Sequence, residues 1–394
     1  MSEKKIIPLA IPNFDDEERR LVDQAIVSNW VSSGGPLVVE FEKVIAEYVG
    51  TPTAAATDSG TSALHTALML AEVGPGDEVL CCPLTYIAAI NPIRYVGAQP
   101  VFLDCDETLC ISPAAVAAFC ENECEMQGEK LINKTTGAHV KSLEVIHIFG
   151  NMAHMPELLA LAEKYNLIVL EDATEALGTR YTAGPMQGKY AGAIGDVGCF
   201  SFNGNKTITT GSGGMLVSPH EQWVQRALYL TNVATNDLGA DTYRQFIHNE
   251  VGYHYRLTNL AAALGLAQMK KLEGFIARKN DFHKMYTQAL DGKNGYRILQ
   301  YNPDAYCNKW FLSLYLEDCP KSRDEMIGYL DANGIQSRPI WTLICDLPPY
   351  KECQCADLTT ARRYRERVVN LPSSTGLTDE EIQTVIDTLL KVSR

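Results

Sequence analysis

The sequence predicts an α/β fold: a large domain with a mostly parallel central sheet flanked by helices, and a smaller C-terminal α+β domain. Between residues 60 and 220, short apolar segments alternate with helical ones, as parallel strands joined by crossover helices require. From Leu257 onward, apolar residues recur at helical spacing over a longer stretch. The length of 394 residues exceeds what one hydrophobic core usually serves. We therefore expect one domain over residues 1–255 and a second over residues 256–394.

The predicted strands of the large domain are short and apolar, with almost no alternation of polar residues. This pattern is typical of strands that are covered on both faces. They span residues 79–82, 101–104, 145–149, 167–171, 197–202 and 215–218, and the helices between them include residues 60–72, 113–120 and 156–165. A connecting helix from residue 257 then leads to a strand over 310–316, a helix over 322–332 and a final helix over 378–392.

Composition and charge exclude several classes of function. The chain has 34 Lys and Arg against 48 Asp and Glu, a formal charge of −14, which argues against a nucleic-acid binder. No apolar run is long enough for a transmembrane helix, and the first residues lack the pattern of a signal peptide, so we expect a cytoplasmic protein away from the membrane. The twelve cysteines contain no C-x-x-C pair, and we expect no metal site.

Two polar residues follow predicted strands at the place where open α/β sheets bind ligands. Asp172 ends the segment 167–172, where a carboxylate can hold a protonated ring nitrogen, although an Asp there can equally cap the next helix. Lys206 lies in a polar turn after the strand 197–202, and a lysine with a depressed pKa can form a Schiff base. The alternative for Lys206 is an ordinary solvated loop lysine.

Two further places complete a candidate site. Gly60 and Thr61 open a helix, whose unpaired N–H groups and dipole favour phosphate, although a plain helix cap explains the same residues. Tyr86 follows the strand 79–82 and could stack on a flat cofactor, or it could pack in the core. An acid, a lysine, a phosphate cradle and an aromatic ring beyond the strands of one sheet together predict an enzyme of the fold-type I class that uses pyridoxal 5′-phosphate (PLP).

Longer motifs resemble a known family. Residues 59–64, 171–178, 200–206 and 251–259 resemble the DegT/StrS (DegT/DnrJ/StrS) family of nucleotide-sugar aminotransferases, and the match covers nearly the whole chain. Within it, residues 203–206, 308–310, 337–341 and 371–373 look most like the branch that makes UDP-4-amino-4,6-dideoxy-N-acetylhexosamines, which includes the LegC-type and bacillosamine-pathway aminotransferases. The resemblance implies the fold of a fold-type I PLP-dependent aminotransferase.

The resemblance also implies roles for individual residues. Lys206 matches the Schiff-base lysine, Asp172 the partner of the pyridine nitrogen, and Glu175 a position near the ring's phenolic oxygen. The phosphate contacts match Gly60, Thr61 and Ser201, and Tyr86 matches the aromatic residue over the ring. The substrate residues match Asn29, Trp30, Val31, Ser32 and Arg338, with Arg256 reaching a diphosphate from the partner subunit. His254 stands where relatives usually have Asn, which reaches across a homodimer to the cofactor phosphate.

These matches imply transfer of an amino group from L-glutamate to the 4-keto carbon of a UDP-linked 4-keto-6-deoxy-N-acetylhexosamine, for surface glycan (lipopolysaccharide) or nonulosonic acid synthesis. The alternatives are an aminotransferase on GDP-4-keto-6-deoxymannose or a dTDP-3-keto sugar, or a non-catalytic nucleotide-sugar sensor. A 3-dehydratase of the same fold resembles this chain with His in place of the lysine, and Lys206 argues against it. The sensor is the least favoured alternative, because a lysine and an aspartate in a cleft usually indicate chemistry.

Overall fold

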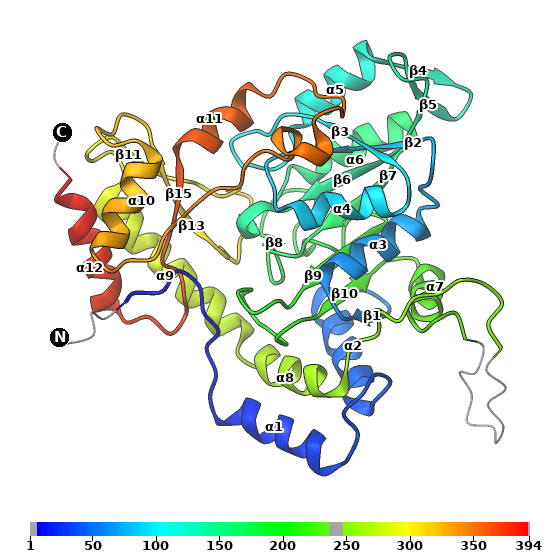
Figure 1. The fold of residues 1–394 in the computed structure, drawn as a ribbon, viewed down its shortest axis with the longest axis horizontal. Coiled ribbons are helices and arrows are strands. Elements are labelled where there is room, and N and C mark those ends of the chain that lie inside the picture. The colour runs from blue at the N-terminus through cyan, green and yellow to red at the C-terminus, as the bar shows by residue number, and fades with distance from the viewer. Residues whose placement is uncertain (1–5, 236–246, 393–394) are drawn as a thin grey trace.

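A twisted sheet with helices on both faces forms the larger part of the molecule, and a smaller domain lies beside it (Figure 1). The computed structural model describes residues 6–235 and 247–392. Within these residues the central sheet has nine strands, in the order β1-β10-β9-β7-β6-β2-β3, with the hairpin β4-β5 attached to β6. Its strands are β1 (Ala54–Thr57), β2 (Asp77–Cys81), β3 (Gln99–Phe102), β4 (Cys124–Gln127), β5 (Lys130–Asn133), β6 (His139–Ile146), β7 (Ile168–Asp172), β9 (Val197–Ser201) and β10 (Gly214–Val217).

The sheet is mixed, but its centre is parallel. Strands β3, β2, β6, β7 and β9 run in one direction, while β10 pairs antiparallel with both β9 and β1. Parallel neighbours deliver their carboxyl ends to the same edge, where open α/β sheets bind ligands. The helices along the large domain are α1 (Asp16–Val27), α2 (Pro36–Val49), α3 (Gly60–Leu70), α4 (Ile87–Tyr95), α5 (Pro113–Asn122), α6 (Met155–Tyr165), α7 (Glu221–Thr231) and α8 (Asn259–Met269).

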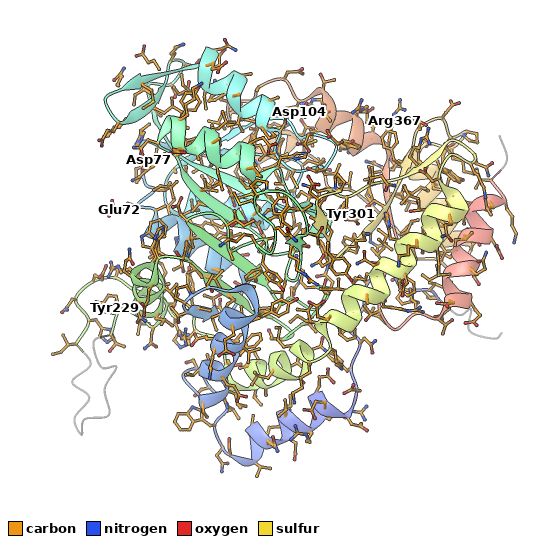
Figure 2. All side chains as sticks on the ribbon, turned by 180° about the vertical axis from the view of Figure 1, so that it is seen from behind. Glu72, Asp77, Asp104, Tyr229, Tyr301 and Arg367 are labelled. Atoms are coloured by element: carbon orange, nitrogen blue, oxygen red, sulfur yellow. The ribbon has the colours of Figure 1, made fainter. Side chains whose placement is uncertain are left out.

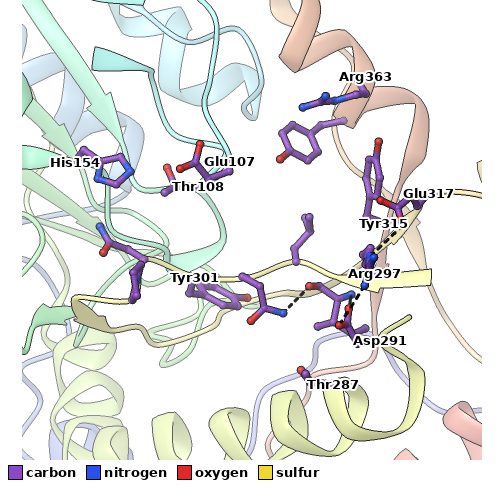
Figure 3. Close-up of a pocket in the computed structure, with 16 residues that line it drawn as sticks. Glu107, Thr108, His154, Thr287, Asp291, Arg297, Tyr301, Tyr315, Glu317 and Arg363 are labelled. Carbon is purple, nitrogen blue, oxygen red and sulfur yellow. Dashed lines mark hydrogen bonds and ion pairs between the residues drawn. The ribbon is translucent and has the colours of Figure 1, made fainter. Parts of the chain in front are cut away.

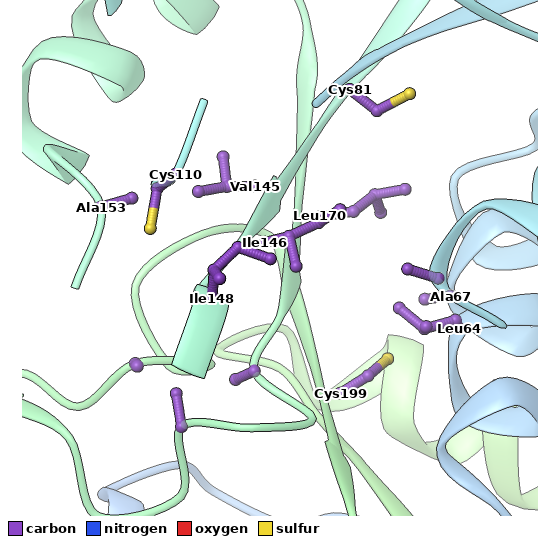
Figure 4. Packing of buried hydrophobic residues seen from close by; sticks show 14 of the residues in the cluster. Leu64, Ala67, Cys81, Cys110, Val145, Ile146, Ile148, Ala153, Leu170 and Cys199 are labelled. Carbon is purple, nitrogen blue, oxygen red and sulfur yellow. The ribbon is translucent and has the colours of Figure 1, made fainter. Parts of the chain in front are cut away.

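Apolar side chains fill both faces of the central strands. Figure 4 shows Leu64 and Ala67 of α3 with Cys199 on one side of the strands, and Cys110, Val145 and Ala153 on the other. Each of these side chains is buried. Burial on both faces explains why the sequence of these strands hardly alternates.

A second core lies in the smaller domain. It packs α9 (Leu272–Leu290), α10 (Arg323–Ala332) and α12 (Asp379–Leu390) against a four-stranded sheet of order β11-β13-β15-β14. These strands are β11 (Tyr296–Ile298), β13 (Leu312–Leu316), β14 (Arg338–Pro339) and β15 (Val368–Leu371), and a separate pair is formed by β8 (Arg180–Tyr181) and β12 (Ala305–Tyr306). The side chain of Ile7 is buried in this second core. The backbone is tied there as well, because the Ile7 N–H donates to the Gly334 carbonyl at 2.9 Å. The start of the chain is therefore part of the packing of the smaller domain.

Segments from the C-terminal part of the chain also pack against the core of the central sheet. Asp104, which follows β3, accepts hydrogen bonds from the N–H groups of Thr360 and Ala361 at 2.8 Å each, and so caps α11 (Thr359–Arg367). Figure 2 shows Asp104 beside that helix and Tyr301 at the junction of the two domains. The Tyr301 hydroxyl donates to the Phe311 carbonyl at 2.5 Å.

The α/β fold class, its central sheet and the smaller C-terminal domain are confirmed. Each of the predicted strands of the large domain overlaps an observed one, but the segment 145–149 ends early, because Ile148–Gly150 forms a 3-10 turn. The prediction missed β1 and the hairpin β4-β5. Strand β1 is mostly alanine, which has low strand propensity. The division of the chain at residues 255 and 256 stays a prediction.

Two structural absences hold for the described part of the chain. Among these residues, no helix combines the length and the apolar character needed to cross a membrane. The same residues contain no group of three or more His, Cys, Asp or Glu side chains placed to hold a metal ion.

Glu144 of β6 is an unusual member of the core. The residue is 1% exposed, and its Oε2 atom has no hydrogen-bond partner. It pairs in register with Leu170, two residues before Asp172 on β7. Burial, together with the nearby Asp172 carboxylate, raises the pKa of Glu144 well above its usual 4.5, so the side chain is held neutral.

Replacing Glu144 with Leu should therefore stabilise the protein. An unsatisfied buried polar atom costs about 1–3 kcal/mol, which the apolar side chain removes. The folded protein keeps the Glu144 proton that the unfolded chain loses above its usual pKa, so wild type loses stability as pH rises. The advantage of Glu144→Leu should grow from mildly acidic to neutral pH in urea unfolding. Glu144→Gln, which stays polar, is the control; equal or lower stability of the Leu variant at neutral pH would contradict this view.

Candidate active site

A pocket of about 250 Å³ lies at the carboxyl ends of β7 and β9, beside the first turn of α3. It brings together seven of the residues that the sequence singled out, from segments far apart in the chain. These are Gly60, Thr61, Tyr86, Asp172, Glu175, Ser201 and Lys206.

Asp172 is the last residue of β7 and is 2% exposed. Its neighbours in register are Ile146 on β6 and Cys199 on β9, so its carboxylate is fixed at the edge of the parallel sheet. Burial raises the pKa of Asp172, while hydrogen bonding from Thr174 and the charge of Lys206 lower it. The Thr174 N–H donates to Oδ1 at 2.9 Å. A buried acid of this kind is suited to pair with a cationic nitrogen of a ligand.

Lys206 lies in the turn after β9, where its N–H donates to the Asn203 carbonyl at 3.0 Å. The side chain is 13% exposed, and Nζ lies 3.8 Å from Oε1 of Glu175. The same Nζ atom lies 4.0 Å from the centroid of the Trp310 ring. Burial lowers the pKa of Lys206, and the carboxylates of Glu175 and Asp172 oppose that shift. A lysine with a lowered pKa has the free amine that carbonyl chemistry requires.

Glu175 completes this group of charges. Its Oε2 atom accepts a hydrogen bond of 2.7 Å from the N–H of Phe149, a residue with a left-handed φ of 55°. Burial raises the pKa of Glu175 to about 7, although Lys206 and the Phe149 N–H act in the opposite direction. Glu175 therefore changes its charge near neutral pH, 3.8 Å from the amine.

The first turn of α3 forms the opposite wall of the pocket. Ser59 caps the helix, with its hydroxyl accepting from the Ser62 N–H at 3.1 Å. A Cβ atom on Gly60 would lie only 2.8 Å from Cβ of Ser201, so the backbone approaches the end of β9 closely. A helix start with free N–H groups binds anions, and phosphate in particular. An acid for a ring nitrogen, an amine and a phosphate site thus fit the three ends of PLP.

Tyr86 precedes α4 and lines the same pocket. Its side chain is not core packing, because the residue is 57% exposed. The ring is therefore available to a ligand.

The other predicted residues do not line this pocket within the described part of the chain. Trp30 is 52% exposed, and His254 and Arg338 are also exposed. The backbone carbonyls of Trp30 and Ser32 accept hydrogen bonds from Asn259, and Asn29 has a φ of 60°. The residues outside the pocket are Asn29, Trp30, Val31, Ser32, His254, Arg256 and Arg338.

Arg256 makes an internal ion pair. Its Nη1 atom lies 2.7 Å from Oε1 of Glu42 and donates to the Ala56 carbonyl at 3.1 Å. The side chain is mostly buried there, which the sequence pattern could not reveal because Glu42 is distant in the chain.

Trp310 is a site residue that the sequence analysis quoted in a motif but did not assign to the site. Its indole N–H donates to the Asn205 carbonyl at 2.6 Å, which holds the ring against the turn of Lys206. Its own carbonyl accepts hydrogen bonds of 3.0 Å from Nζ of Lys279 and from the hydroxyl of Ser373. Trp310 lies 105 residues after Asn205, shortly before β13, and is part of the larger core, so only the folded chain brings it to Lys206.

A larger cavity, of about 740 Å³, lies between the two domains. Figure 3 shows Glu107, Thr108 and His154 on one side and Tyr315, Arg297 and Arg363 on the other. Arg297 is paired with Glu317 at 3.0 Å and with Asp291 at 3.8 Å. This cavity contains no lysine among its lining residues, so the smaller pocket is the candidate active site.

The fold and the pocket define a PLP-dependent aminotransferase. Residues 12–390 match the model of the DegT/DnrJ/EryC1/StrS aminotransferase family. The chain belongs to this family, as its motifs suggested, and it is an aminotransferase.

Named relatives support the family assignment. A GDP-perosamine synthase of Caulobacter vibrioides is 36% identical over 395 residues, covering all of both chains, and one of Escherichia coli O157:H7 is 33% identical over 98% of each chain. The putative pyridoxal phosphate-dependent aminotransferase EpsN of Bacillus subtilis is 34% identical, covering 98% of this chain and 95% of its own. The structure of DesI, determined in the presence of its TDP-sugar product, superposes with a TM-score of 0.83 at 26% identity, over 98% of this chain and 93% of that chain. None of these names refers to a UDP-linked sugar, so the resemblance to the UDP-sugar branch is not confirmed.

The ion pair of Glu175 and Lys206 predicts how the pH dependence of PLP binding changes when Glu175 is replaced. Glu175→Gln removes a carboxylate that favours the protonated amine, so Lys206 should become free at lower pH. Two charges about 4 Å apart interact by about 4 kcal/mol at an effective dielectric constant near 20, and one pKa unit is about 1.4 kcal/mol. The rate at which the apoprotein captures PLP should shift to lower pH by about one unit or more.

The measurement is the growth of visible absorption after mixing apoprotein with PLP over a series of pH values. Glu47→Gln, which alters an exposed acid paired with Lys43, is the matched control and should leave the profile unchanged. An unshifted profile in Glu175→Gln would show that Glu175 does not control the Lys206 proton.

Proposed function

We propose that the protein transfers an amino group from L-glutamate to the 4-keto carbon of a UDP-linked 4-keto-6-deoxy-N-acetylhexosamine. The observation that carries the chemistry is the burial of Lys206 beside Glu175 and Asp172 in one pocket with the first turn of α3. The motifs at 203–206, 308–310, 337–341 and 371–373 support the UDP-sugar branch.

We assign roles to the chain's own groups from this geometry. The first turn of α3, with Gly60 and Thr61, would hold the phosphate of PLP, and Ser201 would add its hydroxyl. Asp172 would pair with the ring nitrogen and favour its protonated form, and Tyr86 would offer its ring to stack on the cofactor. PLP, when bound, supplies the electron sink that lets a proton leave the carbon next to the amine.

Lys206 moves that proton. Its amine, whose pKa is lowered by burial, takes a proton from the amino donor and returns one on the acceptor side. Glu175 lies 3.8 Å from Nζ and titrates near neutral pH, so it adjusts how much of the amine is free. Trp310 lies over the amine, with its ring centroid 4.0 Å from Nζ, and contributes to the burial of the lysine.

The residues outside the pocket suggest a homodimer with shared sites. Trp30 and His254 are exposed and do not line the pocket of their own chain. We propose that the segment Asn29 to Ser32, together with Arg338, contacts the sugar nucleotide, and that His254 reaches the phosphate of PLP in the partner subunit. The internal pair of Arg256 with Glu42 has to open if Arg256 is to contact a diphosphate.

A second candidate is a GDP-linked sugar as the acceptor. Two relatives, at 36% and 33% identity over essentially the whole chain, carry the name GDP-perosamine synthase. On this basis GDP-4-keto-6-deoxymannose is the alternative substrate, with the same roles for Lys206 and Asp172.

Lys206→Ala should lower turnover by at least about 10⁴-fold, because no other described group in the pocket carries an amine. The protein should still fold, as judged by circular dichroism. Lys189→Ala, at an exposed position, is the control and should keep full activity. Substantial turnover in Lys206→Ala would overturn the assignment of the lysine.

Visible absorption of the holoenzyme tests which amino donor and which keto sugar the protein uses. L-glutamate should bleach the yellow band, and UDP-4-keto-6-deoxy-N-acetylglucosamine should restore it. Recovery with GDP-4-keto-6-deoxymannose or a dTDP-3-keto sugar, but not with the UDP sugar, would contradict the proposed acceptor while leaving the aminotransferase intact. A protein that binds PLP but is not bleached by glutamate would contradict the donor, and failure to bind PLP would favour a non-catalytic sensor.

A further inference from the structure

Glu171 of β7 carries a carboxylate that is fully enclosed by the protein. Its side chain is 0% exposed. Oε1 accepts hydrogen bonds from the backbone N–H groups of Ile194 and Gly195 at 2.6 Å each, and Oε2 accepts from the Gly192 N–H at 2.8 Å. The fourth donor is Nε2 of His147, at 2.9 Å from Oε2, and this side chain is also 0% exposed. A charge so far from water needs such a set of donors.

Neither Glu171 nor His147 lines the candidate active site. On β6 and β7, Val145 pairs in register with Glu171, and successive side chains of a strand point to opposite faces of the sheet. Figure 4 shows Val145 with Ala153 on the face away from α3. Glu171 shares that face, whereas Asp172 belongs to the face of α3 and lines the pocket. The buried pair can therefore act on the site only through other residues.

One arm of this network leads to the lysine. The turn that contains Gly192 runs directly into β9, and the Lys206 turn follows that strand. A Cβ atom on Gly198 of β9 would lie 1.9 Å from the carbonyl oxygen of Gly192, so the turn lies against the strand. Because Glu171 binds this turn from the end of β7, it fixes β9 and the Lys206 turn relative to Asp172.

The other arm leads to Glu175. Nδ1 of His147 accepts the Ala153 N–H at 3.3 Å, so the ring carries its proton on Nε2, which faces Glu171. The ring thus ties the loop between these two residues to β7. Within that loop, Phe149 has a left-handed φ of 55° and donates its N–H to Glu175 at 2.7 Å. A left-handed residue other than glycine persists only where its surroundings enforce it.

We propose that Glu171 and His147 are positioning residues of this aminotransferase. From the opposite face of the sheet, they hold the two pocket carboxylates in place beside Lys206. Glu171 does so through β9, and His147 does so through the loop that donates to Glu175. The proposal rests on the assignment of Lys206 as the residue that binds PLP.

The test is the rate at which the apoprotein captures PLP, followed by visible absorption over a series of pH values. Glu171→Gln turns an amide NH₂ group toward two of the four donors, so the network must loosen. The carboxylates should then hold the Lys206 proton less firmly, and the capture profile should move to lower pH by about half a unit.

Glu78→Gln is the matched control. Glu78 lies on β2 of the same sheet and is buried, and its carboxylate accepts hydrogen bonds of 2.7 Å from the side chains of Asn133 and Thr136. It does not line the pocket. Glu78→Gln should therefore lower the thermal midpoint, as Glu171→Gln does, but it should leave the capture profile unchanged.

A second variant separates positioning from stability. His147→Asn keeps an acceptor for the Ala153 N–H, but its shorter side chain no longer ties the loop to Glu171. In the wild-type background it should also move the capture profile to lower pH. In the Glu175→Gln background it should cause no further shift, whereas the losses in thermal midpoint should add.

Circular dichroism shows whether each variant is folded, and His147→Asn decides alone if Glu171→Gln does not fold. An unshifted profile in a folded Glu171→Gln or His147→Asn protein would overturn the positioning role and leave the aminotransferase intact. An equal shift in Glu78→Gln would do the same. Failure of the wild-type protein to capture PLP would overturn the assignment of Lys206, and this proposal with it.

Discussion

The site depends on removing one lysine and two carboxylates from water together. Lys206, Asp172 and Glu175 meet at the edge of the sheet, and burial shifts the pKa of each toward its neutral form while their mutual attraction opposes those shifts. For Lys206, burial lowers the pKa, and the carboxylates of Glu175 and Asp172 act in the opposite direction. The balance places a lysine with a lowered pKa next to an acid whose pKa is about 7, an arrangement suited to proton transfer near neutral pH.

The scaffold explains how this balance is maintained. Parallel β7 and β9 carry Asp172 and the Lys206 turn to the same edge, and α3 adds its first turn. Trp310, from the segment just before β13, then lies over the lysine and is held by the Asn205 carbonyl and by Lys279. Lys279, which donates a hydrogen bond to the Trp310 carbonyl, is itself buried. Its burial lowers the pKa of Lys279 to about 7. Packing of the C-terminal part of the chain therefore contributes directly to the chemistry of the site.

Sequence reasoning reached the fold class and the centre of the site because both depend on local patterns. Apolar strands followed by Asp172 or Lys206 can be recognised within a few residues, and so can the Gly60 turn. What it missed depends on distant pairing: alanine-rich β1 exists because β10 lies beside it, and Trp310 meets Lys206 only in the folded chain. The same holds for Ile7 in the second core and for Arg256 against Glu42.

The central claim is that Lys206 is the residue to which PLP is attached. Borohydride reduction of the holoenzyme fixes the cofactor to whichever amine holds it, and peptide mapping then locates the label. The account predicts one pyridoxyl group per chain, on the peptide that contains Lys206. A label on the buried Lys279 or the partly buried Lys309 would contradict it, and so would a label distributed over surface lysines.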